Sequence, residues 1–143
     1  MRVKQVSVFL ENRTGRLDEV ADILGSRRIN IRALSLADTS DFGILRLIVN
    51  QPEAAYEALR EAGFTTRYTD VIAVEVPDTP GGLAGVLKIF REANLNVEYL
   101  YAFVEKRTEG AVVIFRFEEI DRAVKALAGG SICVLKEEEL LKL

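Results

Sequence analysis

PDTPGGL spans residues 77–83, and ENRTGRL, at residues 11–17, stands 66 residues before it. Each stretch follows alternating apolar residues and precedes apolar residues at helical spacing, so each is a corner between a strand and a helix. Asn30 and Asn96 recur at the same offset of 66 residues. Two copies of about 70 residues indicate a duplicated domain, because a solenoid needs three or more repeats.

Each copy has the same predicted order of elements: strand, helix, strand, strand, helix, strand. Strands are expected where apolar residues alternate, and helices where they recur at i, i+3, i+4 and i+7. The first copy has predicted strands at 3–10, 30–37, 43–50 and 65–68, and helical faces at 17–24 and 52–59. The second has predicted strands at 71–76, 96–104, 111–117 and 131–135, helical faces at 83–90 and 120–127, and a short extra helix at 136–143. The polar stretches 38–41 and 105–109 are expected to be the loops between paired strands.

The order βαββαβ, present twice, is the split-βαβ or ferredoxin-like motif. It predicts an α+β protein with domains at 1–69 and 70–143, each with an antiparallel sheet covered by helices on one face. The opposite face is also apolar, since Ile44 and Ile48 alternate with Leu45, Leu47 and Val49. A face this apolar is not stable in water. We therefore expect a homodimer in which it packs on a second copy, or else two halves that cover each other.

The composition narrows the possible functions. The 143 residues include no histidine, which removes the commonest general base and metal ligand. A net charge of −3 lacks the basic excess of a nucleic-acid binder, and no apolar run reaches the roughly 20 residues of a membrane span. The single cysteine, Cys133, is expected to be a small buried residue of a strand. We predict no enzyme activity, metal, cofactor, nucleic acid or membrane partner and, without a signal-peptide core after residues 1–5, a cytoplasmic location.

The strand–helix corner is the candidate ligand site. Gly15 and Gly81 allow a positive φ and a close approach of a ligand to the backbone. The helix N-terminus that follows favours a carboxylate. Asn30 and Asn96 each begin a predicted strand, and their amides have donors and acceptors for an amino acid's ammonium and carboxylate.

Each of these residues also has a structural explanation. Asx turns or helix caps explain Asn12 and Asp78, a helix start explains Pro80, and local backbone hydrogen bonds explain Asn30 and Asn96. The joint recurrence of corner and asparagine favours ligand binding, although a duplicated structural requirement would produce the same recurrence.

The segments at 77–83 and 93–97 (ANLNV) resemble the ACT domain family, whose hallmark is an Asp-x-Pro-Gly corner followed by an asparagine-initiated strand. The resemblance covers the whole chain as two copies end to end. The first copy departs from it, with Asn12 in place of the aspartate and Thr14 in place of the proline. The resemblance implies a regulatory protein that binds an amino acid at interfaces between paired domains and regulates a metabolic enzyme.

The ligand-site residues that follow from this resemblance are Asn12, Gly15, Arg16, Leu17, Asn30, Ile31, Asp78, Pro80, Gly81, Gly82, Leu83, Asn96 and Val97. For the apolar members among them a core role is an equal alternative. A site of backbone, one amide and apolar walls favours a small apolar ligand, such as a branched-chain or aromatic amino acid. The alternative function is an interaction subunit that docks onto a catalytic partner without binding any ligand.

Overall fold

The computed structural model describes residues 1–38, 41–103 and 110–142. Its contacts divide the chain into a first unit, Lys4–Thr69, and a second unit made of Met1–Val3 and Asp70–Leu143. Part of the predicted loop at 38–41 and the whole of the loop at 105–109 lie outside the described residues. Within the described part of the chain, no helix is both long and apolar enough to cross a membrane.

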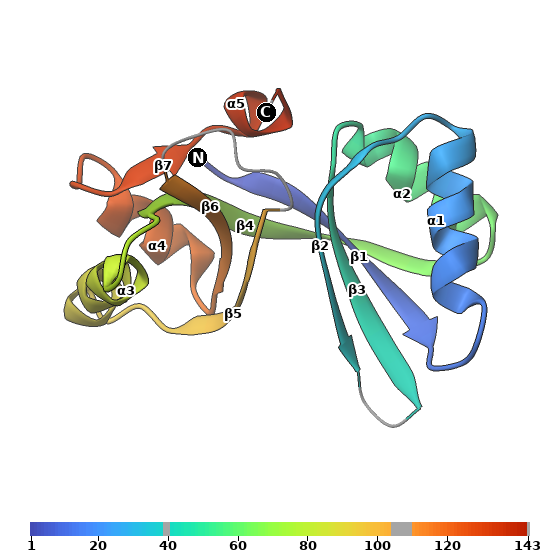
Figure 1. Cartoon of the computed structure of the whole chain (residues 1–143), viewed down its shortest axis with the longest axis horizontal. Helices are drawn as coiled ribbons and strands as arrows, with labels where there is room; N and C mark the ends of the chain where they lie inside the picture. The colour runs from blue at the N-terminus through green and yellow to red at the C-terminus, as the bar shows by residue number, and fades with distance from the viewer. Residues whose placement is uncertain (39–40, 104–109, 143) are drawn as a thin grey trace. The chain divides into compact units, whose positions relative to one another are not determined.

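The first unit has the predicted ferredoxin-like arrangement. Its elements are β1 (Val3–Glu11), α1 (Arg16–Ser26), β2 (Ile31–Asp38), β3 (Phe42–Val49), α2 (Pro52–Glu61) and the beginning of β4 (Thr65–Pro77). The strand order is β2-β3-β1-β4, and β3 is antiparallel to both of its neighbours. Figure 1 shows α1 and α2 on the same side of this sheet.

The core of the first unit forms where the helices meet the sheet. Alternate strand residues face the helices, as the period of two in a β-strand requires. Residues spaced four apart on each helix face the sheet in turn, which buries apolar surface from both layers. The fully or nearly fully buried members are Val6, Val8, Leu10, Val20, Leu24, Leu45, Leu47, Val49, Ala55 and Leu59.

The second unit repeats this arrangement. After β4 come α3 (Gly82–Glu92), β5 (Val97–Ala102), β6 (Gly110–Phe117), α4 (Ile120–Leu127), β7 (Cys133–Leu135) and α5 (Glu137–Leu141). The strand order is β5-β6-β4, with β7 on the other side of β4, and all these pairs are antiparallel. In its core, Phe90 of α3 meets Phe115 and Phe117 of β6 edge to face, with ring centroids 5.0 Å apart in each pair.

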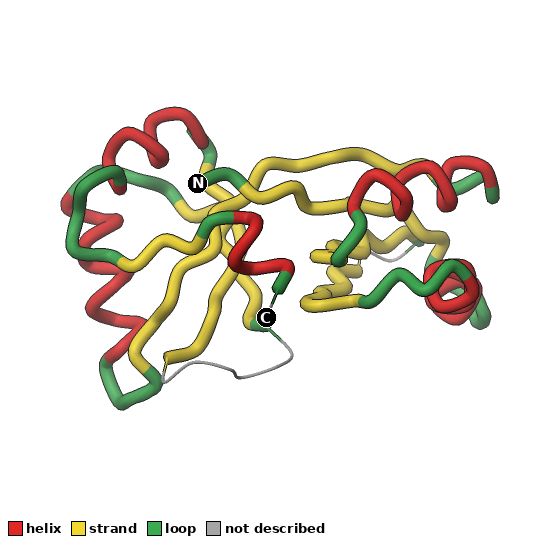
Figure 2. The backbone as a smooth tube through the Cα atoms, turned by 90° about the horizontal axis from the view of Figure 1, so that it is seen from above, coloured by secondary structure: helices red, strands yellow, loops and turns green. Residues whose placement is uncertain are grey.

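Two predictions about strands need correction. The strands predicted at 65–68 and 71–76 are one continuous strand, β4, because no glycine or proline interrupts the β-prone residues between Thr65 and Val76. Figure 2 shows this run of strand as one path. The last strand is shorter than predicted, so Ser131 and Ile132 precede β7 rather than belonging to it.

Cys133 is exposed rather than buried, because the side of β7 that faces away from β4 has no paired strand in the described part of the chain.

The prediction that both sheet faces are apolar is confirmed. Opposite the helices, Ala33 pairs with Ile48 and Ala73 pairs with Ile114, and none of the four has exposed surface. The homodimer that we expected from this pattern stays a prediction.

Candidate functional site

Both strand–helix corners are type II turns. In the second unit the amide of Gly82 donates to the carbonyl of Thr79 at 2.9 Å, and Gly81 has φ 83° and ψ −4°. These are the angles of the third residue of a type II turn, which requires glycine, and Pro80 suits the position before it. In the first unit Gly15 has φ 91° and ψ −13°. The positive φ expected at both glycines is confirmed, and these glycines, not Asn12 and Asp78, directly precede the helices.

The second corner has little space between its backbone segments. A Cβ atom on Gly82 would lie 1.9 Å from the carbonyl oxygen of Pro77, so this position accepts only glycine without a shift of the backbone. At Gly85, one turn later, an added Cβ atom would have no neighbour within 4 Å, so there is open space beside the helix. The chain therefore brings the end of β4 against the first turn of α3, and the two glycines leave this side of the helix without side chains.

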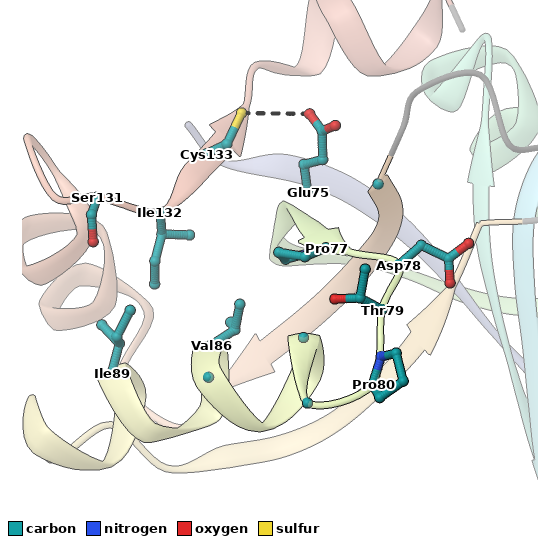
Figure 3. A pocket seen from close by; sticks show the side chains of 14 residues that line it. Glu75, Pro77, Asp78, Thr79, Pro80, Val86, Ile89, Ser131, Ile132 and Cys133 are labelled. Carbon is teal, nitrogen blue, oxygen red and sulfur yellow. Dashed lines mark hydrogen bonds between the residues drawn. The ribbon is translucent and has the colours of Figure 1, made fainter.

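A pocket of about 890 Å³ lies at this corner. Figure 3 shows its walls, which come from the end of β4, the start of α3 and the segment before β7. Four of the predicted site residues, Asp78, Pro80, Gly81 and Gly82, line it. The other lining residues are Glu75, Pro77, Thr79, Gly85, Val86, Ile89, Gly110, Ser131, Ile132 and Cys133.

The walls of the pocket offer three kinds of chemistry. The first turn of α3 presents backbone amides, because the first N–H groups of a helix have no partner within it. Thr79 and Ser131 supply hydroxyl groups that donate and accept hydrogen bonds. Val86, Ile89 and Ile132 form an apolar wall, visible together in Figure 3. Such a pocket suits reversible binding of a small molecule that has both polar and apolar parts.

Glu75 and Cys133 border the pocket from paired positions on β4 and β7. The Cys133 thiol donates to Oε2 of Glu75, with sulfur and oxygen 3.7 Å apart, as drawn in Figure 3. Burial, followed by the nearby Glu75 carboxylate, raises the pKa of the Cys133 thiol. The thiol is thus kept protonated, as a hydrogen-bond donor. Sequence reasoning missed this pair, because no local pattern links two residues 58 positions apart.

The equivalent corner of the first unit is filled by its own side chains. Arg16 stands where the second unit has Gly82, and it forms ion pairs with Glu11 at 3.0 Å and Glu19 at 3.1 Å. Its guanidinium also lies 5.9 Å from the centre of the Phe64 ring. Hydrogen bonding to Glu19 is the main factor that raises the pKa of Arg16, which keeps it charged. The pocket that remains there, bordered by Phe9, has about 180 Å³.

The two asparagines lie away from the corners within their own units. Asn96 follows the far end of α3, and a helix of this length separates it from Gly81 by about 16 Å at 1.5 Å per residue. Its amide donates to Glu118 at 3.2 Å. In the first unit the backbone amide of Asn30 donates to the Asn50 side chain at 2.9 Å. These bonds join the start of one strand to the segment after its neighbour, which is a structural role.

The four apolar site candidates divide into two groups. Leu17 and Leu83 are exposed on the first turns of α1 and α3, outside the corner pockets. Ile31 and Val97 pack against the cores of their own units. Among the described residues, no group of three or more His, Cys, Asp or Glu side chains is placed to hold a metal ion.

Comparisons with known proteins agree with this geometry. A family model described as an ACT domain pair matches residues 1–143. The protein BT0572 from Bacteroides thetaiotaomicron is 39% identical, with a TM-score of 0.91, over 100% of this chain and 98% of that chain. A comparison with curated proteins finds no match.

Two regulatory systems share the fold at lower identity. The regulatory subunit of aspartate kinase from Thermus thermophilus, in its ligand-free form, has 19% identity and a TM-score of 0.60, with 87% of this chain and 90% of that chain covered. E. coli aspartokinase III has 14% identity and a TM-score of 0.51, with 90% and 31% covered. Since the family match spans the whole length and each unit has the ferredoxin-like order, this chain belongs to the ACT domain pair family.

Proposed function

We propose that this protein is a regulatory sensor that binds a small amino acid in the corner pocket of its second unit. The observation that carries the proposal is the difference between the two corners. The same type II turn borders about 890 Å³ in the second unit and about 180 Å³ in the first. The open corner is also the one with the Asp-x-Pro-Gly sequence, at Asp78 to Gly81.

The walls of this pocket match the parts of an amino acid. The amides at the start of α3 favour the ligand's carboxylate, because the helix dipole is positive there. Val86, Ile89 and Ile132 favour an aliphatic or aromatic side chain. E. coli aspartokinase III, which shares the fold, was solved in complex with lysine and aspartate, and this supports a related role here.

Binding is tested by measuring the melting temperature and the heat of binding with each of the twenty amino acids. We expect stabilisation by at least one, and a stoichiometry of one molecule per chain, because Arg16 fills the first corner. A flat response to all twenty would contradict the proposal and favour an interaction subunit that binds no ligand. Two molecules per chain would contradict the assignment to the second corner alone.

A matched pair of variants locates the site. Gly85 lines the pocket and has room for a side chain, whereas its neighbour Ala84 is exposed outside the pocket. We expect Gly85→Leu to abolish binding by filling the pocket, and Ala84→Leu to leave binding unchanged. Equal binding by both variants would place the ligand elsewhere.

The wider assembly is part of the same proposal. We expect a homodimer, which light scattering would detect as twice the chain mass, and a metabolic enzyme as the regulated partner. A monomer mass across the working concentration range would refute the dimer. It would leave the binding assays above as the test of the sensor function.

A further inference from the structure

The pocket of the second unit has a carboxylate at a place where the first unit has none. Glu75 lies on β4 between Val74 and Val76, which are both buried. The residue 66 positions earlier is Phe9, whose ring lies 5.6 Å from the Arg67 guanidinium. Glutamate is disfavoured in strands. A half-buried carboxylate at this position of the sheet therefore calls for an explanation beyond the fold.

The surroundings of Glu75 hold its carboxylate in place without neutralising it. Gly110 lies beside it on β6, and a Cβ atom there would come within 2.7 Å of the Glu75 Cγ and 3.1 Å of its Oε1. On the other side, the thiol of Cys133 donates to Oε2. Figure 3 shows Glu75 and Cys133 facing one another across this side of the pocket. A thiol is an uncharged donor, so the negative charge of Glu75 remains.

The lining residues, all in the described part of the chain, include the carboxylates of Glu75 and Asp78 and no lysine or arginine. A partly buried carboxylate attracts a cation more strongly than an exposed one, because the local dielectric constant is lower. We infer that Glu75 binds the ammonium group of the ligand and so selects amino acids over the same acids without an amine. This inference rests on the proposed function and adds the residue that determines specificity.

The first test uses the unmodified protein. Its probes are L-leucine, L-valine and L-phenylalanine, each paired with the acid that lacks the amine: 4-methylpentanoate, 3-methylbutanoate and 3-phenylpropanoate. We expect the amino acid of a binding pair to bind about tenfold or more tightly, as a charge-assisted hydrogen bond implies. Equal binding within every pair would overturn the role of an ammonium group and leave the pocket itself intact.

The second test uses Glu75→Gln, with Glu92→Gln as the control. Glu92 is an exposed residue at the end of α3 that does not line the pocket. We expect Glu75→Gln to weaken binding of the amino acids about tenfold and to bring the two members of each pair close to equal. Glu92→Gln should preserve the original preference. The melting temperature of each variant without ligand shows that it is folded.

The outcomes separate the two proposals. Unchanged preference in a folded Glu75→Gln variant would overturn the role of Glu75 and leave amino-acid sensing standing. No binding of any of the twenty amino acids by the unmodified protein would overturn the sensor function, and the role of Glu75 with it. If Glu75→Gln does not fold, the comparison within pairs on the unmodified protein decides the matter.

Discussion

Replacing Gly82 with alanine tests whether the second corner is as tightly packed as the structure indicates. The new Cβ atom would lie 1.9 Å from the carbonyl oxygen of Pro77, whereas ordinary contacts begin near 3.4 Å. The helix start or the end of β4 must therefore move by about 1.5 Å, the difference between these two distances. Neither side of this contact is a flexible side chain, so the strain cannot be relieved by a change of rotamer.

The size of the effect follows from two opposing contributions. Overpacking of this kind costs about 1–3 kcal/mol, and a contact with backbone places the cost near the upper end. Replacing glycine with alanine returns about 0.4–1 kcal/mol, because the unfolded chain loses conformational freedom. We expect a net loss of about 2 kcal/mol in the free energy of unfolding.

Gly85→Ala is the matched control, since it makes the same chemical change three residues later in the same helix. No atom lies within 4 Å of the added Cβ position, so only the favourable contribution remains. We expect this variant to gain about 0.5–1 kcal/mol. Urea denaturation followed by circular dichroism measures both changes, and the two variants should differ by about 10 °C in melting temperature. If Gly82→Ala is as stable as Gly85→Ala, the close approach of Pro77 to the helix is wrong.

Three further predictions follow from contacts elsewhere. Phe90→Ala removes the aromatic centre of the second core and should cost about 3–5 kcal/mol in urea denaturation; a loss below about 1 kcal/mol would contradict its burial. The Lys4 hydrogen bond lowers the pKa of Glu53 from its ordinary 4.5, so the pair stabilises the fold above that pH and stops doing so as pH falls through the lower folded value. Lys4→Met should therefore cost up to about 1 kcal/mol at about pH 7 and nothing at about pH 3, and an equal cost at both would refute the linkage. Because burial and Glu75 raise the pKa of Cys133, its alkylation by iodoacetamide should be slower than that of free cysteine and severalfold faster in Glu75→Gln, and an unchanged rate would argue against the contact.

The order of the elements could be predicted from the sequence because each depends on a local period. Val20 and Leu24 show the helical spacing and Leu45 and Leu47 the alternation that their burial in the structure requires. The positive φ of Gly81 could also be predicted, because a turn with Pro80 before it requires glycine at that place.

The contents of the pocket could not be predicted, because they depend on strand pairing. Glu75 and Cys133 meet only through the register of β4 with β7, which no periodicity encodes. The substitution of Arg16 for Gly82 is visible in the repeat, but the closure of the first corner depends on how that side chain reaches Glu11 and Phe64. Asn96 recurs in sequence with the corner, yet the helix between them keeps the two apart.

The continuity of β4 has a consequence for how this protein can be divided. The boundary between the units, at Thr69 and Asp70, falls inside a strand of 13 residues. A protease needs a segment that can leave its hydrogen bonds, and exposed loop tips supply such segments more readily than paired strands. A fragment that ended at this boundary would carry a severed strand, with backbone groups open to pairing with other chains. Limited proteolysis should therefore spare the boundary, and separate expression of either unit should favour aggregation.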